Sequence, residues 1–214
     1  MTFAHHGVLF LDEVPEFQSH VLESLRQPLE DGRVTIVRVG GIGHFPARIQ
    51  LVAAANPCRR GCTALDRCVC TPGERQRYLG RLSRPLLDRI DLHVQLPALS
   101  ASEIQLAASI DRSSNVRERV LAAREQQRVR FAGSSAGANA DMTARQLRKL
   151  CRVPPDAERL LAAAVERLGL SARGHDRVLR VARTIADLAG AADIAIEHVA
   201  EAVQYRGLDR TWRT

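Results

Sequence analysis

The chain has 214 residues, enough for one large domain or for a medium-sized domain and a small one. Hydrophobic residues make up 45% of it, which predicts a packed core, and the lack of a stretch of roughly 20 apolar residues or of a signal-peptide pattern predicts a cytoplasmic protein with no membrane partner. The net charge of +7 is compatible with a nucleic-acid partner. Acidic residues are interleaved with the basic ones, so the charge alone does not show whether the chain binds nucleic acid.

The N-terminal part of the chain predicts an α/β domain, which we place at residues 1–98. Val8 to Leu11 is a short apolar run followed by two carboxylates, Asp12 and Glu13. This pattern is typical of a buried parallel strand with acids at its carboxyl end. Apolar residues at helical spacing over residues 17–29 then predict a helix.

The remaining elements of this domain are expected from apolar runs and turn signals. Two β-prone runs separated by a glycine pair predict a β-hairpin over residues 34–45. The apolar run at 49–55 predicts a second buried strand. A short helix near 74–82 and a last strand over 92–96 complete the α/β fold class.

Helical patterns dominate residues 99–214, which predicts an all-helical second domain. A stretch rich in glycine, serine and alanine near 133–140 predicts a flexible link between two helical groups. A long amphipathic helix is expected after Ser171 and a final helix near 197–205. Three arginines of the long helix are interpreted as a solvated or interdomain face: Arg177, Arg180 and Arg183.

Polar side chains at the ends of the two buried strands are candidate catalytic residues. Asp12 can hold Mg²⁺, usually through water, because this hard cation prefers oxygen ligands. A hydrophobic strand that ends in two adjacent acids resembles the Walker B arrangement of P-loop ATPases. That resemblance implies that Glu13 orients and deprotonates the water that attacks the γ-phosphate of ATP, and that Asn56 hydrogen-bonds that phosphate or water. The alternatives are a buried strand that ends by chance in two acids and an ordinary Asn-Pro turn.

Two arginines are candidates for contacts with phosphate. Arg89 follows an apolar helical turn, so it can project from a subunit edge toward the γ-phosphate held by a neighbouring subunit. The alternative is a helix C-terminal arginine paired with Asp88 or Asp91. Arg173 lies in the first turn of the helix capped by Ser171, where the helix dipole disfavours a cation, and this indicates an anionic partner.

Four of the five cysteines fall within thirteen residues. The spacing Cys58-x₃-Cys62-x₅-Cys68-x-Cys70 can supply four thiolates to a structural Zn²⁺, although zinc loops more often use pairs two to four residues apart. Free thiols are the alternative. Cys151 lies in a helical segment and is interpreted as a packing residue.

Several of these motifs, taken in order, resemble the magnesium chelatase subunit I-like branch of the AAA+ ATPases. The order is an acidic strand, a hairpin, Asn-Pro-Cys, Leu-Leu-Asp-Arg-Ile-Asp and Ala-Arg-Thr-Ile-Ala-Asp-Leu. Within that branch, residues 10–17, 45–58 and 181–188 most resemble the competence protein ComM/YifB group. The resemblance implies a partial P-loop AAA+ core, a parallel sheet with an inserted hairpin, followed by an all-helical lid domain.

The resemblance also implies roles for the candidate residues. Asp12 and Glu13 correspond to the Walker B acids, and ATP and Mg²⁺ are the expected cofactors. The other correspondences are Asn56 to sensor 1, Arg89 to the arginine finger and Arg173 to sensor 2. The hairpin corresponds to the pre-sensor insertion, where Arg38 and His44 could touch a nucleic acid; a purely structural ribbon is the alternative. Self-association into a ring, with a hexamer as the family expectation, and a DNA partner are implied as well.

One departure from the family pattern concerns the phosphate-binding loop. Such a loop needs Gly-Lys followed by Ser or Thr, whereas the only lysine of the chain, Lys149, lies in a helical segment after Arg148. We therefore expect a chain that resembles the back half of a longer protein, is inactive alone and needs an N-terminal P-loop portion as a partner.

Three functions remain open at this point. The first is an ATP-driven motor for DNA remodelling, in particular branch migration. The second is a magnesium chelatase motor subunit. The third is a catalytically inactive fragment that acts as an interaction module.

Overall fold

The computed structural model describes residues 1–62, 68–99, 112–134 and 136–207. These residues form two compact units, Met1–Ile90 and the part of the chain from Asp91 onward. The domain limits expected from the sequence, 1–98 and 99–214, stay a prediction. The expected change to helical character at residue 100 and Ser135 of the expected link lie outside the described residues.

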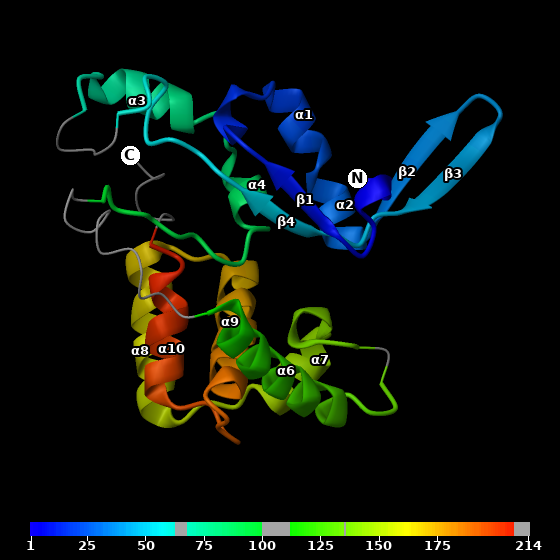
Figure 1. Cartoon of the computed structure of the whole chain (residues 1–214), viewed down its shortest axis with the longest axis vertical. Helices are drawn as coiled ribbons and strands as arrows, with labels where there is room; N and C mark the ends of the chain where they lie inside the picture. The colour runs from blue at the N-terminus through cyan, green and yellow to red at the C-terminus, as the bar shows by residue number, and fades with distance from the viewer. Residues whose placement is uncertain (63–67, 100–111, 135, 208–214) are drawn as a thin grey trace. The chain divides into compact units, whose positions relative to one another are not determined.

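The first unit is an α/β unit with two pairs of β-strands, one parallel and one antiparallel (Figure 1). Strand β1 pairs in parallel with β4, and β2 pairs with β3 as an antiparallel hairpin inserted between them in the sequence. The parallel pairing and the inserted hairpin are therefore confirmed. In chain order the elements are η1 (Thr2–Ala4), β1 (Val8–Leu11), η2 (Val14–Glu16), α1 (Ser19–Ser24), α2 (Arg26–Asp31), β2 (Arg33–Arg38), β3 (Gly41–Pro46), β4 (Gln50–Ala53), α3 (Pro72–Leu79) and α4 (Arg84–Leu87).

The register of the parallel pair brings the carboxyl ends of both strands to one edge of the sheet. Leu11, the last residue of β1, lies opposite Ala53, the last residue of β4. The pairing continues past both strands, because the Ala54 amide donates to the Leu11 carbonyl (2.9 Å) and the Val14 amide to the Ala54 carbonyl (2.9 Å). The polar residues that follow each strand therefore leave the sheet side by side.

Two sequence predictions about this region need correction. The helix expected over 17–29 is two short helices, α1 and α2, which meet at Leu25. The strand expected over 92–96 is not formed, and its apolar residues Leu92, Val94 and Leu96 are exposed. A strand needs a neighbouring backbone, and here the His93 amide donates instead to the Tyr205 carbonyl (2.8 Å).

The second unit is helical, and α9 lies at its centre. Helix α9 packs against α6, α7 and α10, and α10 also packs against α8. Alanines without measurable exposure, Ala157, Ala182 and Ala186, let the helices approach closely around Val178 and Val199. The described elements are α6 (Ser113–Arg130), η3 (Asn139–Asp141), α7 (Ala144–Leu150), α8 (Pro155–Leu168), α9 (Ala172–Leu188) and α10 (Ile196–Gln204).

Several smaller expectations about this unit have clear outcomes. The Ser171 hydroxyl accepts from the Gly174 amide (3.1 Å), so the predicted start of α9 is confirmed. Cys151 is buried in the helical core, as expected for a packing residue, and burial raises the pKa of its thiol to about 11. Within the described ranges, no helix combines the length and the apolar character needed to cross a membrane.

A buried polar cluster centred on Asp187 ties the helices together. The Asp187 carboxylate accepts from Arg130 of α6 (2.7 Å), from Asn139 of η3 (2.8 Å) and from Arg183, one turn earlier on α9 (3.1 Å). Arg183 also donates to the carbonyls of Ala191 and Ala192 beyond the helix end. Its side chain is only 3% exposed, so the interpretation of Arg183 as part of a solvated face is wrong.

Candidate functional site

The turn after β1 presents two exposed carboxylates. The Asp12 carboxylate accepts from the Glu13 amide (2.9 Å). Glu13 has left-handed backbone angles, φ 49° and ψ 45°, which cost a non-glycine residue about 1–2 kcal/mol. Val14 and Pro15 are buried directly after it and hold the turn against the unit. The buried neighbours therefore hold the Glu13 backbone in this left-handed conformation.

Asn56 follows β4 at the same edge of the sheet and is exposed. Two carboxylates and a carboxamide thus leave neighbouring strand ends, a set that offers oxygen donors to a hard cation and hydrogen bonds to a phosphate or a water. The chemistry of this donor set fits Mg²⁺ bound to a nucleotide.

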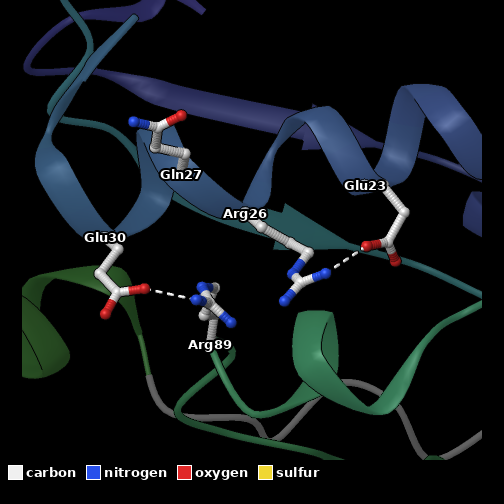
Figure 2. Close-up of a pocket in the computed structure, with 5 residues that line it drawn as sticks. All are labelled: Glu23, Arg26, Gln27, Glu30 and Arg89. Carbon is white, nitrogen blue, oxygen red and sulfur yellow. Dashed lines mark hydrogen bonds and ion pairs between the residues drawn. The ribbon is translucent and has the colours of Figure 1, made fainter.

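Arg89 lies just after α4 and is held by α2 of the same unit. Its guanidinium forms an ion pair with Glu30 and donates to the Pro85 carbonyl (2.6 Å), and its side chain is only 10% exposed. The alternative expectation, a pair with Asp88 or Asp91, is therefore not what holds this guanidinium, and Asp91 pairs with Arg177. Figure 2 shows Arg89 and Glu30 facing one another across a shallow pocket.

The same pocket contains a second ion pair, Arg26–Glu23 (2.6 Å), as Figure 2 shows. Glu23 also accepts a hydrogen bond from Ser83, the residue that caps α4. The hydrogen bond from Ser83 and the one from Arg26 lower the pKa of the Glu23 carboxyl. Helices α1 and α2 therefore fix both ends of the segment that carries Arg89.

The two residues expected to touch a nucleic acid, Arg38 and His44, lie at different positions along the hairpin. Arg38 lies opposite Gly41 at the tip, whereas His44 lies opposite Thr35 in the middle of the ribbon, where its Nδ1 is 3.1 Å from the Thr35 hydroxyl. Because side chains alternate along a strand, Arg38 and His44 project from opposite faces. Both are exposed. Exposed apolar residues surround the tip, namely Val37, Val39 and Ile42, which the sequence analysis did not single out.

Arg173 belongs to the first turn of α9 in the helical unit and is exposed. Its assignment as a phosphate contact stays a prediction.

The four clustered cysteines are brought together. The sulfur atoms of Cys58, Cys62, Cys68 and Cys70 all lie within 4.8 Å of one another. Burial would raise the pKa of the Cys58 thiol, but hydrogen bonds from the other three cysteines outweigh it and lower that pKa to about 6. Burial and the neighbouring Cys58 raise the pKa of Cys70 to about 12. Four sulfurs this close together can act as the ligands of one metal ion.

Residues that the sequence analysis missed connect this cluster to the acidic turn. Arg81, just after α3, donates to the Pro15 carbonyl (2.8 Å) and forms an ion pair with Glu16 (3.4 Å). Arg59 also lies 4.0 Å from Glu16. No local pattern could have identified Arg81 or Glu30, because their partners lie about sixty residues away in the sequence.

Comparison with known families covers both units. The family model described as magnesium chelatase, subunit ChlI, matches residues 1–104, and the one described as magnesium chelatase, subunit ChlI C-terminal, matches residues 111–206. The chain belongs to the magnesium chelatase ChlI family. The resemblance expected from the sequence is thereby confirmed, and ATP and Mg²⁺ are the cofactors that this AAA+ type of family suggests.

Several curated proteins match almost the whole chain. An uncharacterised protein of Mycobacterium tuberculosis is 45% identical over 203 residues, 95% of this chain and 40% of that protein. The competence protein ComM of Haemophilus influenzae is 43% identical over 98% of this chain and 41% of its own length. The uncharacterised protein YifB of Salmonella typhimurium is 41% identical over the same shares. The chain therefore spans about 40% of the length of these relatives.

Proposed function

We propose that the chain forms the back half of the catalytic machinery of an ATP-driven AAA+ motor that remodels DNA. The observation that supports this best is the parallel register of β1 and β4, which sends Asp12, Glu13 and Asn56 from one edge of the sheet. Similarity to the competence protein ComM supports DNA, rather than a porphyrin, as the substrate.

Each candidate residue has a role in this proposal. Asp12 would hold the Mg²⁺ of the nucleotide, Glu13 would accept a proton from the attacking water, and Asn56 would orient that water. Bound ATP with Mg²⁺ supplies the phosphoryl group. Arg89 reaches the nucleotide of a neighbouring subunit in a ring, and Arg173 contacts phosphate from the helical lid. The chain has no Gly-Lys-Ser/Thr sequence, so a different polypeptide segment supplies the phosphate-binding loop.

The acidic turn gives the first test. A separately made segment that carries the P-loop is mixed with the chain, and steady-state ATP hydrolysis is compared for the wild type and the Glu13→Gln variant. We expect the mixture to hydrolyse ATP and the chain alone to be inert. Glu13→Gln, which keeps the shape of the side chain but removes the general base, should lower the rate about 10²–10⁴-fold without weakening ATP binding.

A matched control is Glu118→Gln, which neutralises an exposed carboxylate on α6 and should leave the rate unchanged. Hydrolysis by the chain alone would contradict the need for a separate P-loop. Inert mixtures of every variant would instead favour an interaction module without catalysis. ATP-dependent metal insertion into a porphyrin, without any DNA affinity, would favour a chelatase.

The hairpin gives a second test, of DNA binding. Arg38→Ala should weaken binding of the chain to a short duplex about 3–10-fold and lower the magnitude of the salt-dependence slope by about 1, because one phosphate contact is lost. Fluorescence anisotropy over a salt series measures both. Arg33→Ala, at the base of the same strand, removes an equal charge and is expected to have the smaller effect. Equal effects for the two variants would show that the tip makes no specific contact.

A further inference from the structure

The cysteine cluster joins two segments that follow different elements. Cys58 and Cys62 lie in the turn after β4, and Cys68 and Cys70 lie directly before α3. Cys58 and Cys70 are buried, whereas Cys62 and Cys68 are partly exposed. Each segment thus contributes one buried and one partly exposed cysteine. The four sulfurs form a compact group near the surface of the unit.

We propose that these four sulfurs bind one structural Zn²⁺ that fixes the turn carrying Asn56 to the start of α3. Zinc in structural sites is bound tetrahedrally by four ligands with Zn–S bonds of about 2.3 Å, which places the sulfurs about 3.8 Å apart. The observed spread, at most 4.8 Å, needs only a small contraction to reach that geometry. All four ligands come from the chain, as in closed structural zinc sites.

The backbone around the first pair is already arranged for metal binding. The Gly61 amide donates to the Cys58 carbonyl (3.1 Å), and Gly61 has a positive φ of 64°, which turns the chain back on itself. The Cys62 amide then donates to the Cys58 sulfur (3.4 Å). An N–H donor to a sulfur favours its thiolate form, which is the form that binds a metal.

Positive groups offset the charge that such a site would carry. Zn²⁺ with four thiolates has a net charge of about −2. Arg59 and Arg60 lie inside the turn between the first two cysteines, and Arg75 of α3 donates to the Cys70 carbonyl (3.2 Å). Three arginines thus lie next to the cysteines in sequence or donate to their backbone, and their positive charge offsets part of the negative charge of such a site.

The position of the cluster defines what the metal does. Cys58 lies two residues after Asn56, and Cys70 immediately precedes Thr71, whose side chain and that of Glu74 cap α3. Just beyond the other end of this helix, Arg81 holds the Pro15 carbonyl in the turn after the acidic residues. Bound zinc therefore connects the turn that carries Asn56 to the start of α3. The far end of α3 is in turn connected, through Arg81, to the turn that carries Glu13. This positioning role rests on the proposed function, whereas metal binding itself does not.

Metal analysis of the purified 214-residue chain tests the site without any ATPase assay. We expect about one zinc per chain, and a Co²⁺-substituted form with the visible absorption of a tetrahedral thiolate complex. The double variant Cys62→Ser/Cys68→Ser removes one partly exposed sulfur from each pair, so the core stays filled, and should lower zinc content about tenfold or more. Cys151→Ser, in the helical unit, should keep the zinc.

Hydrogen exchange of the wild type gives a second measurement that does not depend on how a variant folds. Removal of zinc by a chelator should speed amide exchange in residues 68–79 while α9 keeps its protection, and added Zn²⁺ should restore the slow exchange. The proposal is overturned by any of three results: four freely reactive thiols with no bound zinc, disulfides among the four cysteines, or zinc retained by the double variant. A normal zinc site, together with no ATP hydrolysis by the mixture of the chain and the P-loop segment, would contradict only the proposed function.

Discussion

Replacement of Arg89 by alanine should lower ATP hydrolysis by the assembled motor about 10³–10⁵-fold, the effect expected for the loss of an arginine finger. ATP affinity should change little, because the guanidinium acts on charge that develops at the γ-phosphate during transfer. The partner left behind, Glu30, is 43% exposed and stays hydrated, so the variant should fold normally. Arg124→Ala, which removes an exposed arginine of α6, is the control of equal charge.

A mixing experiment decides whether Arg89 acts on a neighbouring subunit. Chains with Glu13→Gln and chains with Arg89→Ala are each expected to be inactive. After random mixing into rings, about a quarter of the interfaces combine an intact Glu13 with an intact Arg89 from the next subunit, and activity should return in proportion. No recovery on mixing, with both variants still able to assemble, would contradict action in trans.

The proposed role of Arg89 requires that this arginine change its partner. In the isolated unit its guanidinium is held by Glu30 and the Pro85 carbonyl, so a phosphate of the neighbouring site has to displace an internal carboxylate. The sequence could place Arg89 after a helical turn, but not this contact, because Glu30 lies 59 residues earlier in the chain.

Local patterns predicted the elements that carry the candidate site better than the contacts between them. The glycine pair at 40–41 predicted the hairpin and the apolar runs predicted β1 and β4, because turn geometry and strand burial are written in short stretches of sequence. The run at 92–96 has the same appearance but forms no strand, since alternating apolar residues do not say whether a neighbouring backbone is present.

Asp187→Asn should destabilise the helical unit by about 3–5 kcal/mol, the cost of leaving buried charges without their partner. The side chain of Asp187 has no exposed surface and receives hydrogen bonds from Arg130, Asn139 and Arg183. Asparagine keeps the shape but turns an amide donor toward two guanidinium groups. Urea unfolding, followed by far-ultraviolet circular dichroism, measures the loss, and Asp193→Asn on an exposed turn is the control.

The pH dependence of stability gives an independent measure of the same cluster. Burial would raise the pKa of the Asp187 carboxyl, but hydrogen bonds from Arg130 and Asn139 outweigh it and lower this pKa. Because the folded-state pKa is lowered, the stabilisation is fully present above the ordinary aspartate pKa of about 4 and is lost as pH falls below it. The Asp187→Asn variant should lack this acid-sensitive part, and a loss of stability under about 1 kcal/mol at neutral pH would contradict the assigned role.

The contacts of Arg183 also show why the sequence analysis wrongly assigned this arginine to a solvated face. The sequence pattern predicts which face of α9 carries Arg183. It cannot show that the carbonyls of Ala191 and Ala192, beyond the end of the helix, accept hydrogen bonds from its guanidinium. Asn139 falls within the stretch expected to be a flexible link, yet it is buried and hydrogen-bonded to Asp187 and Thr184. The family motif in α9 therefore has a structural reason that is independent of ATP.

The left-handed backbone at Glu13 has a consequence for engineering. Glycine adopts this conformation without the steric cost that glutamate bears, so a selection for thermal stability alone would favour glycine at position 13. Such a selection would remove the carboxylate while leaving the fold intact. If Glu13 has the proposed catalytic role, libraries built to make this chain more robust should hold position 13 constant, because heat resistance favours glycine there and turnover requires the carboxylate.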